Sequence, residues 1–337
     1  MRAYEIGPQS GLGSLRLVER ETPEPGPGEV AVKVRAASLN HRDLLTLKGQ
    51  YGPLKAQDRI PVSDGVGSVT GIGENVSGIS IGQRVTAPNF VTWLDGKFTP
   101  AVFAQDLGIS RDGWLAETII FPADAVIAVP DNVSDDAAAT IAAAGSTIWN
   151  CIVTFGGVEK GDLVLTLGTG GVSILTLQIA KALGADVAIT SSSNDKLARC
   201  KELGADYCVN YRENADWAAA LMAETGGRGA DIVVETAGLN SIEQSITACA
   251  PNGRIALIGA LSGQLDNVPQ LGGLIGKNVT MKGITAGSGA MLGELIDLIS
   301  RKDIKPLIDR TFTFDDAPAA FAHLESGDHM GKVMIAL

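Results

Sequence analysis

Histidine and cysteine are scarce in this chain of 337 residues, which has three of the first and four of the second. No two cysteines form a Cys-x-x-Cys pair, so the sequence indicates neither a disulfide framework nor a structural zinc module. We therefore expect reduced, mostly buried thiols at four positions. These are Cys151, Cys200, Cys208 and Cys249.

Positive charge is also in short supply. The 27 Lys and Arg residues face 38 Asp and Glu, which leaves a formal charge of −11. No basic stripe exists that could replace the counterions of a phosphate backbone, so we expect no nucleic-acid partner. The first ten residues have no apolar stretch behind Arg2, and no secretory signal is expected.

Long unbroken apolar runs are missing. The two longest uncharged stretches, Ala137–Val158 and Leu163–Ala180, contain Gly, Ser, Thr or Asn at several positions. A membrane span would need about 20 strongly apolar residues. We expect buried helices and strands in both stretches, no membrane partner and a cytoplasmic location.

The sequence shows two different patterns of apolar and polar residues, and its length is typical of about two domains. Up to about residue 144, "EVAVKVRAAS" alternates apolar and polar residues, and "DGVGSVTGIGENVSGISIGQRVTAP" packs short Val/Ile runs between glycine turns. Both patterns are typical of a small antiparallel β-barrel. From about Val158 short apolar strands alternate with amphipathic helices, which predicts an α/β domain with a doubly wound parallel sheet. The tail after about residue 287 is predicted as helix, edge strand, helix and last strand.

The segment "LGTGGVSI" follows a predicted strand and opens a predicted helix. In this context glycines permit a tight turn and a close approach of a pyrophosphate, which the helix N-terminus also attracts. Ser173 takes the last glycine position of the motif, so helix and strand are expected to pack slightly less closely there. A dinucleotide is the expected ligand. Its expected contacts in the loop are Gly168, Thr169, Gly170, Gly171 and Val172.

The end of the next strand discriminates between dinucleotides. An NAD site usually has a carboxylate there for the ribose hydroxyls. Here Ser191, Ser192 and Ser193 occupy the position, and the first carboxylate is Asp195. A 2′-phosphate would meet no negative charge, and the hydroxyls and Lys196 can bind it. NADPH is therefore favoured, with NADH the less favoured alternative.

Two later strand ends belong to the same expected site, because open α/β sheets bind ligands at the carboxyl ends of their strands. "ETAG" (Glu235–Gly238) and "LIGALSG" (Leu257–Gly263) follow such strands. Ala237, Gly238 and Gly259 would let the nicotinamide ribose approach the backbone closely.

Taken together, four segments resemble the medium-chain dehydrogenase/reductase superfamily: "VRAASLNHRDLLTLKGQY", "GSVTGIGENVSGISIGQRV", the stretch from "LGTGGVSI" to "NYRE", and "HLESGDHMGKVMI". The resemblance implies a GroES-like β-barrel catalytic domain at residues 1–144 and 287–337. A Rossmann domain is implied at 145–286, with the active site in the cleft and a small-molecule substrate. It also implies a homo-oligomer, commonly a dimer through the Rossmann domains.

The chain departs from the zinc-dependent members of this superfamily. The positions that match their three zinc ligands are Asn40, Ser63 and Ala143, none of which is a good ligand. We therefore expect no zinc. Asp64 matches a carboxylate beside the metal, and with no cation next to it we expect a solvated or hydrogen-bonded group.

Among zinc-free members the chain is most similar to quinone oxidoreductases of the zeta-crystallin type, through "SLNHRDLL" and "NYR". The resemblance makes Tyr211 a contact of the 2′-phosphate, which strengthens the preference for NADPH. It also implies that Lys332 of "MGK" touches the cofactor. A subgroup called zinc-type alcohol dehydrogenase-like shares the "SSSNDK" and "SDG" details.

Without a metal, an acceptor that delocalises the charge arriving with a hydride is favoured, because hydrogen-bond donors then suffice. The first hypothesis is hydride transfer from NADPH to a quinone or a conjugated enone or enal. The alternatives are a metal-independent dehydrogenase of an allylic or benzylic alcohol, and a non-catalytic NADPH-binding protein.

Three polar residues are candidates for the catalytic pocket. Asn40 can donate to a carbonyl or merely cap a turn. His41 can contact the pyrophosphate, relay a proton or be structural. Tyr51 can be a phenol donor or simply pack. Aromatic residues of the nearby loops can line an apolar cleft or belong to the core, and these are Phe90, Trp93, Phe98 and Trp114.

Overall fold

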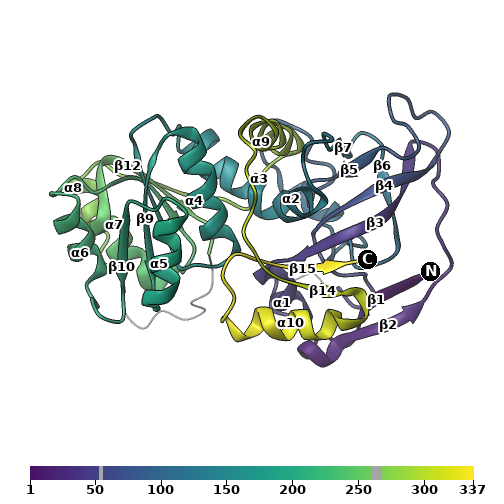
Figure 1. The fold of residues 1–337 in the computed structure, drawn as a ribbon, viewed down its shortest axis with the longest axis horizontal. Helices are drawn as coiled ribbons and strands as arrows, with labels where there is room; N and C mark the ends of the chain where they lie inside the picture. The colour runs from purple at the N-terminus through teal and green to yellow at the C-terminus, as the bar shows by residue number, and fades with distance from the viewer. Residues whose placement is uncertain (53–55, 260–267) are drawn as a thin grey trace. The chain divides into compact units, whose positions relative to one another are not determined.

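The computed structural model describes residues 1–52, 56–259 and 268–337, and the chain divides into two compact units. The first unit comprises Met1–Ser146 and Gly287–Leu337, and the second Thr147–Ala286. Figure 1 shows the course of the chain through both. The second half of "LIGALSG", after Gly259, lies outside the described residues.

The first unit is built on a sheet in the order β14-β15-β3-β4-β5-β7, with β6 paired to β3, in which every pair but β14–β15 is antiparallel. A two-stranded sheet of β1 and β2 accompanies it. The strands are β1 (Arg2–Ile6), β2 (Leu15–Glu19), β3 (Glu29–Leu39), β4 (Asp64–Ile72), β5 (Arg84–Thr86), β6 (Thr118–Pro122), β7 (Ile127–Ala128), β14 (Ile308–Thr313) and β15 (Lys332–Ala336). The helices are α1 (His41–Leu47), α2 (Asp135–Ile141), α9 (Gly289–Lys302) and α10 (Ala317–Ser326), with 3₁₀ turns at Leu12–Ser14, Pro100–Gln105 and Phe314–Asp316. Helix α3 (Ala143–Trp149) begins in the first unit and ends in the second.

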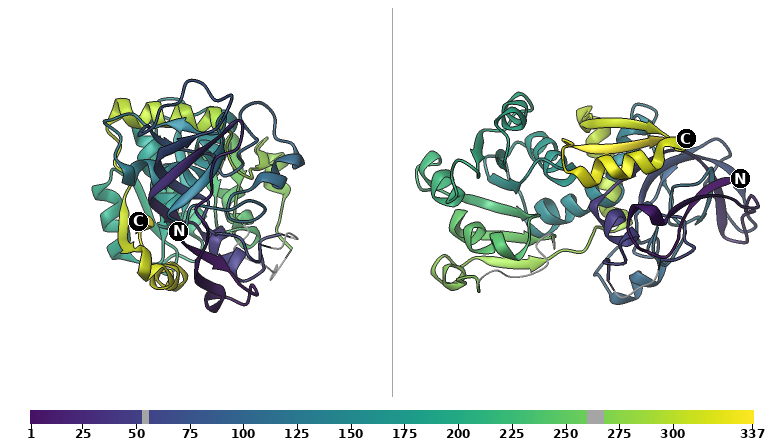
Figure 2. Two further views of the ribbon diagram at one scale, coloured as in Figure 1. Left: turned by 90° about the vertical axis from the view of Figure 1, so that its right-hand side faces the viewer. Right: turned by 90° about the horizontal axis from the view of Figure 1, so that it is seen from below.

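The C-terminal tail is an integral part of this sheet. β15 pairs antiparallel with β3, with Val333 opposite Leu39, and parallel with β14. The last strand of the chain therefore lies beside β3, a strand from its N-terminal part, as Figures 1 and 2 show.

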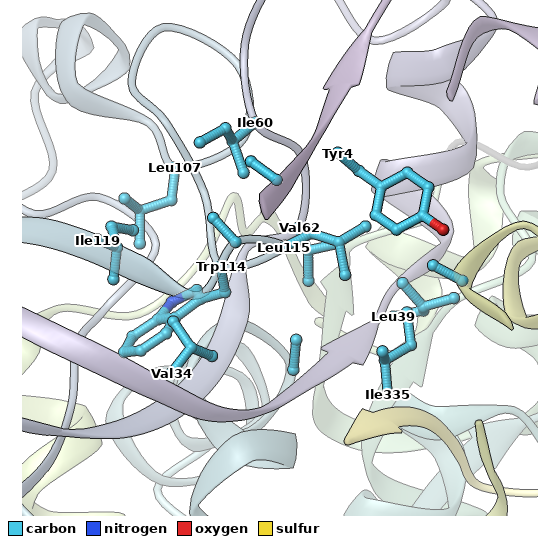
Figure 3. Close-up of a cluster of buried hydrophobic side chains, with 14 of the residues drawn as sticks. Tyr4, Val34, Leu39, Ile60, Val62, Leu107, Trp114, Leu115, Ile119 and Ile335 are labelled. Atoms are coloured by element: carbon cyan, nitrogen blue, oxygen red, sulfur yellow. The ribbon is translucent and has the colours of Figure 1, made fainter. Parts of the chain in front are cut away.

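One continuous core lies on this framework. Trp114 and Phe121 are fully buried, with ring centroids 4.8 Å apart. Figure 3 shows Trp114 among aliphatic side chains that come from distant parts of the chain, among them Val34 and Leu39 of β3 and Ile335 of β15. Because the tail contributes to this core, its position relative to β3 is fixed by packing as well as by the strand ladder.

The second unit has a six-stranded parallel sheet in the order β10-β9-β8-β11-β12-β13, with helices on both of its sides (Figure 1). The doubly wound sheet predicted from the sequence is confirmed. Its strands are β8 (Leu163–Leu167), β9 (Asp186–Ser191), β10 (Tyr207–Asn210), β11 (Ala230–Glu235), β12 (Cys249–Leu257) and β13 (Thr280–Gly283). Its helices are α4 (Gly171–Leu183), α5 (Asn194–Glu202), α6 (Trp217–Glu224), α7 (Ile242–Ala248) and α8 (Gly272–Gly276), with a 3₁₀ turn at Leu239–Ser241.

The strand order reverses between β8 and β11, because β8 lies between its successor β9 and the later β11. Doubly wound sheets bind ligands beside such a reversal, at the carboxyl ends of the strands. The turn after β8 is the glycine loop, and the turn after β11 is "TAG". Both turns lie at the reversal.

The long apolar stretch before the sheet is helical and largely buried, as expected. After α3 it continues as a π-helix, Asn150–Phe155, which the sequence analysis did not predict. Among the described residues no single helix is long and apolar enough to cross a membrane. One bent pair, Asp135–Ile141 with Ala143–Phe155, meets the criteria by length and composition alone.

Candidate functional site

In the first unit, three neighbouring strands begin or finish at the same end of the sheet. Strand β3 ends at Leu39, β4 begins at Asp64 opposite Ser38, and β15 begins at Lys332. Because β15, β3 and β4 are neighbours in that order, residues that lie far apart in the sequence come together. Asn40, which follows β3 directly and precedes α1, stands among them.

Lys332 is buried at this junction, with 1% of its side chain exposed. Its ammonium donates to the carbonyl of Leu39 at 3.1 Å, to Oδ1 of Asn40 at 2.6 Å and to Oδ2 of Asp64 at 3.1 Å. These three acceptors match the three N–H groups of an ammonium. Lys332 was expected to touch a cofactor, and the structure places its charge inside the first unit against Asp64.

Asp64 is fully buried and accepts hydrogen bonds on both carboxylate oxygens. Oδ1 accepts from the backbone N–H of Ala143, and Oδ2 accepts from Nδ2 of Asn40 at 2.8 Å and from Lys332. The expectation that no cation stands beside Asp64 is wrong. The sequence offered no sign of the pair, because its members are 268 residues apart.

Asn40 is half-buried, and the cluster fixes its amide. Oδ1 faces the ammonium, while Nδ2 faces Asp64 and lies 3.4 Å from Oγ of Ser63. The backbone N–H of Asn40 donates to Oδ2 of Asp43 at 2.7 Å, which closes the N-terminus of α1. Asn40 therefore takes part both in the start of α1 and in a polar cluster.

Asp43 lies close behind this cluster and is almost wholly buried. Burial raises the pKa of its carboxyl to about 6, against the opposing effect of Arg42 and of the hydrogen bond from Asn40. Asp64 raises this pKa further and Lys332 lowers it. The carboxyl thus exchanges its proton much closer to neutrality than an ordinary aspartic acid does.

His41 and Tyr51 lie at the two ends of α1. His41 is exposed, yet the desolvation of its ring and the charge of Lys48 lower its pKa, so the ring is neutral near pH 7. Tyr51 is half-buried against the core of the first unit, and the guanidinium of Arg42 lies 4.7 Å from its ring centroid. No hydrogen bond of its phenol is found among the described residues.

Arg42 is itself held by a buried carboxylate that the sequence analysis missed. Its Nη2 lies 2.6 Å from Oδ1 of Asp106, which also accepts from Asn89 at 3.3 Å. Burial raises the pKa of Asp106, against the effect of Arg42. An acidic residue inside the apolar "FAQDLGI" segment was the available signal.

The aromatic residues of the loops are mostly core. Phe90, Trp93 and Trp114 are buried, and Phe90 forms an edge-to-face contact with Phe103 at 5.2 Å. Phe98 is partly exposed and contacts Trp93 and Phe103. Of this set, Phe98 alone presents substantial aromatic surface to solvent.

The glycine loop of the second unit has the geometry of an anion site. Gly168 has a φ of 79° and its Cβ position is open, while Gly170 is the N-cap of α4. No side chain caps this helix and no acidic residue stands in its first turn. The backbone N–H groups of its first turn can therefore donate hydrogen bonds to a phosphate. Gly170, Gly171 and Val172 are partly exposed there, and Thr169 is nearly buried.

Ser173, at the position of the last motif glycine, contributes a hydrogen bond of its own. Its Oγ donates to the carbonyl of Leu167 at 2.6 Å, as does Oγ1 of Thr236 at 2.7 Å. The end of β8 is therefore tied to α4 and to the turn after β11 at the same carbonyl.

The turn after β11 is organised by Glu235, whose role the sequence analysis missed. This carboxylate is fully buried and accepts from the N–H groups of Ala237 and Gly238 at 2.8 and 2.9 Å. It also accepts from the hydroxyls of Ser241 and Ser245. Gly259 is required by close packing, because a Cβ there would overlap the carbonyl of Thr236.

At the end of β9 the three serines differ. Ser191 is buried, and its carbonyl accepts from the N–H of Tyr211 at 3.0 Å. Ser193 caps α5 through the N–H of Lys196. Ser192 is half-buried and forms no side-chain hydrogen bond within the described residues, and the ring of Tyr211 is 42% exposed.

Two family models match the chain. Residues 26–131 match the alcohol dehydrogenase GroES-like domain, and residues 171–301 match the zinc-binding dehydrogenase family. A zinc-type alcohol dehydrogenase-like protein of Schizosaccharomyces pombe is 40% identical, with 97% of this chain and 96% of that protein covered.

Solved structures agree with these matches. An NAD-dependent alcohol dehydrogenase is 33% identical, with all of both chains covered and a TM-score of 0.90. A mycobacterial protein in complex with NADPH is 28% identical over all of both chains, with a TM-score of 0.83. A quinone oxidoreductase of Pseudomonas syringae is 26% identical, covers 100% of this chain and 99% of its own, and has a TM-score of 0.83.

The fold and its relatives define an NAD(P)-dependent oxidoreductase with a GroES-like domain and a Rossmann sheet. Both the oxidoreductase class and the fold expected from the sequence are confirmed. The chain belongs to the medium-chain dehydrogenase/reductase superfamily.

Many members of this superfamily are named for zinc, and the residues present here do not form a zinc-ligand set. An amide, a hydroxyl and a methyl group stand at the three positions, and an ammonium lies against the amide oxygen. Among the described residues no group of three or more His, Cys, Asp or Glu side chains is placed to hold a metal ion.

The raised pKa of Asp43 predicts a pH-dependent stability. The folded protein holds this proton up to about pH 6, whereas an unfolded aspartic acid releases it near pH 4, so the stabilisation is present below pH 4 and is lost as the pH rises through 6. Asp43→Asn, which cannot ionise, should gain about 2–3 kcal/mol relative to the wild type between pH 4 and 7. Urea unfolding across this range measures the difference.

The exposed Asp124→Asn is the matched control and should show no such pH-dependent gain. Parallel pH profiles of the wild type and Asp43→Asn would contradict the assignment.

Proposed function

We propose that this protein is an NADPH-dependent, metal-independent oxidoreductase that transfers a hydride to a quinone or to a conjugated enone or enal. The observation that carries the proposal is the hydrogen-bonded Lys332–Asp64–Asn40 cluster, in which Asn40 stands at the position of a zinc ligand. The similarity of the chain to a quinone oxidoreductase and to a protein complexed with NADPH supports the proposal.

NADPH supplies the hydride when bound. The free amides of α4 and the loop residues Gly168, Gly170 and Gly171 bind its pyrophosphate. The turn that Glu235 organises keeps Ala237 and Gly238 in place for the nicotinamide ribose. The residues described thus fit a dinucleotide along the carboxyl ends of β8, β9 and β11.

The acceptor is bound by neutral hydrogen-bond donors. An amide or a phenol stabilises a localised alkoxide much less than a divalent cation does, and the difference is several kcal/mol. A quinone or an enone spreads the incoming charge, so the amide of Asn40 and the phenol of Tyr51 suffice. His41, neutral near pH 7, is suited to pass a proton from solvent.

The preference for NADPH rests on the end of β9. No carboxylate follows this strand before Asp195, and the hydroxyl of Ser192 is available. Lys196 and the exposed ring of Tyr211 complete the site for a 2′-phosphate. Arg212, the exposed residue next to Tyr211, adds a second cation that the sequence analysis did not single out.

The first test is cofactor oxidation by protein that has been dialysed against EDTA. We expect fast loss of NADPH absorbance with a quinone and an enone, slow loss with NADH, and little with a plain aldehyde. Activity with the aldehyde alone would contradict the charge-delocalisation argument. A loss of all activity in EDTA that zinc restores would contradict metal independence.

The same assay also tests two alternative functions. Similarity to an NAD-dependent alcohol dehydrogenase favours oxidation of an allylic or benzylic alcohol. Turnover of such alcohols without reduction of quinones or enones would support it. Binding of NADPH without turnover of any acceptor would support a non-catalytic binding protein.

Cofactor preference can be reversed at one position. Ser192→Asp places a negative charge where the 2′-phosphate is expected, and it should weaken NADPH binding about 10- to 100-fold, because a charge-assisted hydrogen bond of about 1.5–3 kcal/mol is replaced by repulsion. NADH binding should be unchanged or tighter. Fluorescence titration measures both dissociation constants.

Ser192→Asn is the matched control, since it has the size of Asp without the charge. It should weaken NADPH binding only slightly. Equal losses for NADPH and NADH in Ser192→Asp would place the 2′-phosphate elsewhere.

We also propose a homodimer that forms through the edge of the second unit's sheet. Strand β13 is the edge strand, all of its residues are exposed, and Ile275 of the preceding α8 is 88% exposed. Leu271 and Met281 add exposed apolar surface. An unpaired edge with apolar neighbours is a template for pairing with a second copy.

Sedimentation of Ile275→Lys tests this interface. The variant should lower the dimer's stability and shift the protein toward monomer, because a charge would be buried at the contact. Ile81→Lys, on an exposed apolar residue of the first unit, should leave the mass unchanged. A wild-type protein that sediments as a monomer would show the proposal to be wrong.

The four cysteines are all free, three of them buried and Cys208 half-buried. Burial raises the pKa of Cys200 and of Cys249 to about 12, which keeps both thiols protonated and unreactive. Unpaired thiols are typical of reducing compartments. We propose a cytoplasmic location on this ground.

A further inference from the structure

The backbone that carries Lys332 is held rigidly in place. Gly331 has a φ of 83°, and a Cβ there would overlap the carbonyl of Leu307. Asp309 accepts the N–H of Met330 at 2.9 Å and lies 2.7 Å from Nε2 of His323. These contacts fix the backbone at the start of β15, from which the side chain of Lys332 extends.

That ammonium dictates the orientation of the Asn40 amide. An ammonium has only donors, so the amide oxygen must face it, and the amide nitrogen then faces Asp64. A flipped amide would set its N–H groups against the ammonium and its oxygen against the carboxylate of Asp64. Both contacts would be repulsive, so one orientation is selected.

One N–H of the Asn40 amide forms only a weak hydrogen bond within the protein. The first donates to Asp64 at 2.8 Å, whereas Ser63 Oγ lies 3.4 Å from Nδ2, at the long limit of a hydrogen bond. Asn40 also keeps part of its surface exposed. The second N–H is thus the group that a carbonyl oxygen of an acceptor can take.

The cluster also explains how the site is neutral without a metal. The charge of Lys332 offsets that of Asp64, the ammonium has an acceptor for each of its three N–H groups, and both oxygens of Asp64 accept hydrogen bonds. A divalent cation would have to displace the ammonium and would find an amide, a hydroxyl and a methyl group instead of ligands. The residues therefore do not fit zinc.

We propose that Lys332 is the positioning residue of this active site: it holds the Asn40 amide with one N–H directed to the acceptor, and it occupies the place of a metal as an internal cation. The proposal rests on the proposed function in one respect, that Asn40 is a donor to the acceptor. In this role the three N–H groups of Lys332 bind protein acceptors, and the residue acts on the acceptor only through Asn40.

Three variants test the role of Lys332. Lys332→Met leaves Asp64 buried and unpaired, so its melting temperature should fall by roughly 10 °C. In Lys332→Met/Asp64→Asn no charge is left unpaired, and most of this loss should be recovered. Lys302→Met, on the exposed end of α9, is the control for removal of a lysine and should behave as the wild type.

Turnover separates positioning from stability. In the double variant the amide is no longer held, so kcat should stay about 100-fold low, as when a single oxyanion donor is removed. KM for the acceptor and the dissociation constant of NADPH should change little. Recovery of kcat together with the melting temperature would overturn the proposal. A rise in the NADPH dissociation constant would also overturn it, because Lys332 would then be a cofactor ligand.

A readout that needs no substrate keeps this test independent of the proposed function. With ¹⁵N-labelled asparagine, the side-chain amide signals of Asn40 are identified by their loss in Asn40→Ala. They should shift and exchange faster with solvent in the double variant, because ammonium and carboxylate are gone. Unchanged signals would overturn the proposal. If the wild type reduces no acceptor but the signals shift, the proposed function fails while the orienting contact stands.

Discussion

The ion pair of Lys332 and Asp64 depends on one feature of the fold, the pairing of β15 with β3. That ladder places the first residue of the last strand beside the last residue of β3, and β4 starts on the other side. Because the ladder also contributes Ile335 to the main core, the strand that carries Lys332 is held by packing as well as by hydrogen bonds. The proposed site of the first unit therefore depends on the hydrophobic core.

The second unit uses the same physical device in a different form. Its turns at the strand reversal are fixed by a buried carboxylate, Glu235, and by the carbonyl of Leu167, which accepts two hydroxyls. In both units, buried acceptors with several donors hold loops in single conformations. Burying such a group is favourable only when its hydrogen bonds are made, so the surrounding backbone has little freedom.

The sequence predicted what local patterns encode. The glycine loop, the helix that follows it and the absence of a carboxylate after β9 are all readable within about thirty residues, and so was the alternation that predicted the doubly wound sheet. The Lys332–Asp64 pair was not readable, because its two members are 268 residues apart and neither interrupts a periodic pattern. Asp64 was expected to be solvated or hydrogen-bonded without a cation: it is hydrogen-bonded, and the return of the tail to β3 supplies the cation that was not expected.

The missed roles of Asp106 and Glu235 share one physical cause. Each is an acidic residue in or beside an apolar segment, and a sequence pattern interprets such a residue as exposed to solvent. In the fold both are buried, because other donors take the place of water: Arg42 for Asp106, and two nearby serines for Glu235. Side-chain partners of this kind leave no periodic signal, whether they are 64 residues away or ten.

The proposed replacement of a metal by the ammonium of Lys332 has a chemical consequence. A metal ion has open coordination positions and can bind a substrate oxygen directly, whereas an ammonium with three filled donors cannot. Its influence must pass through the group that it orients, and here that group is a neutral amide. A neutral donor discriminates among acceptors by how much charge remains on the oxygen in the transition state. In the function that we propose, this makes conjugated acceptors better substrates than simple carbonyls, although the fold is shared with zinc-type relatives.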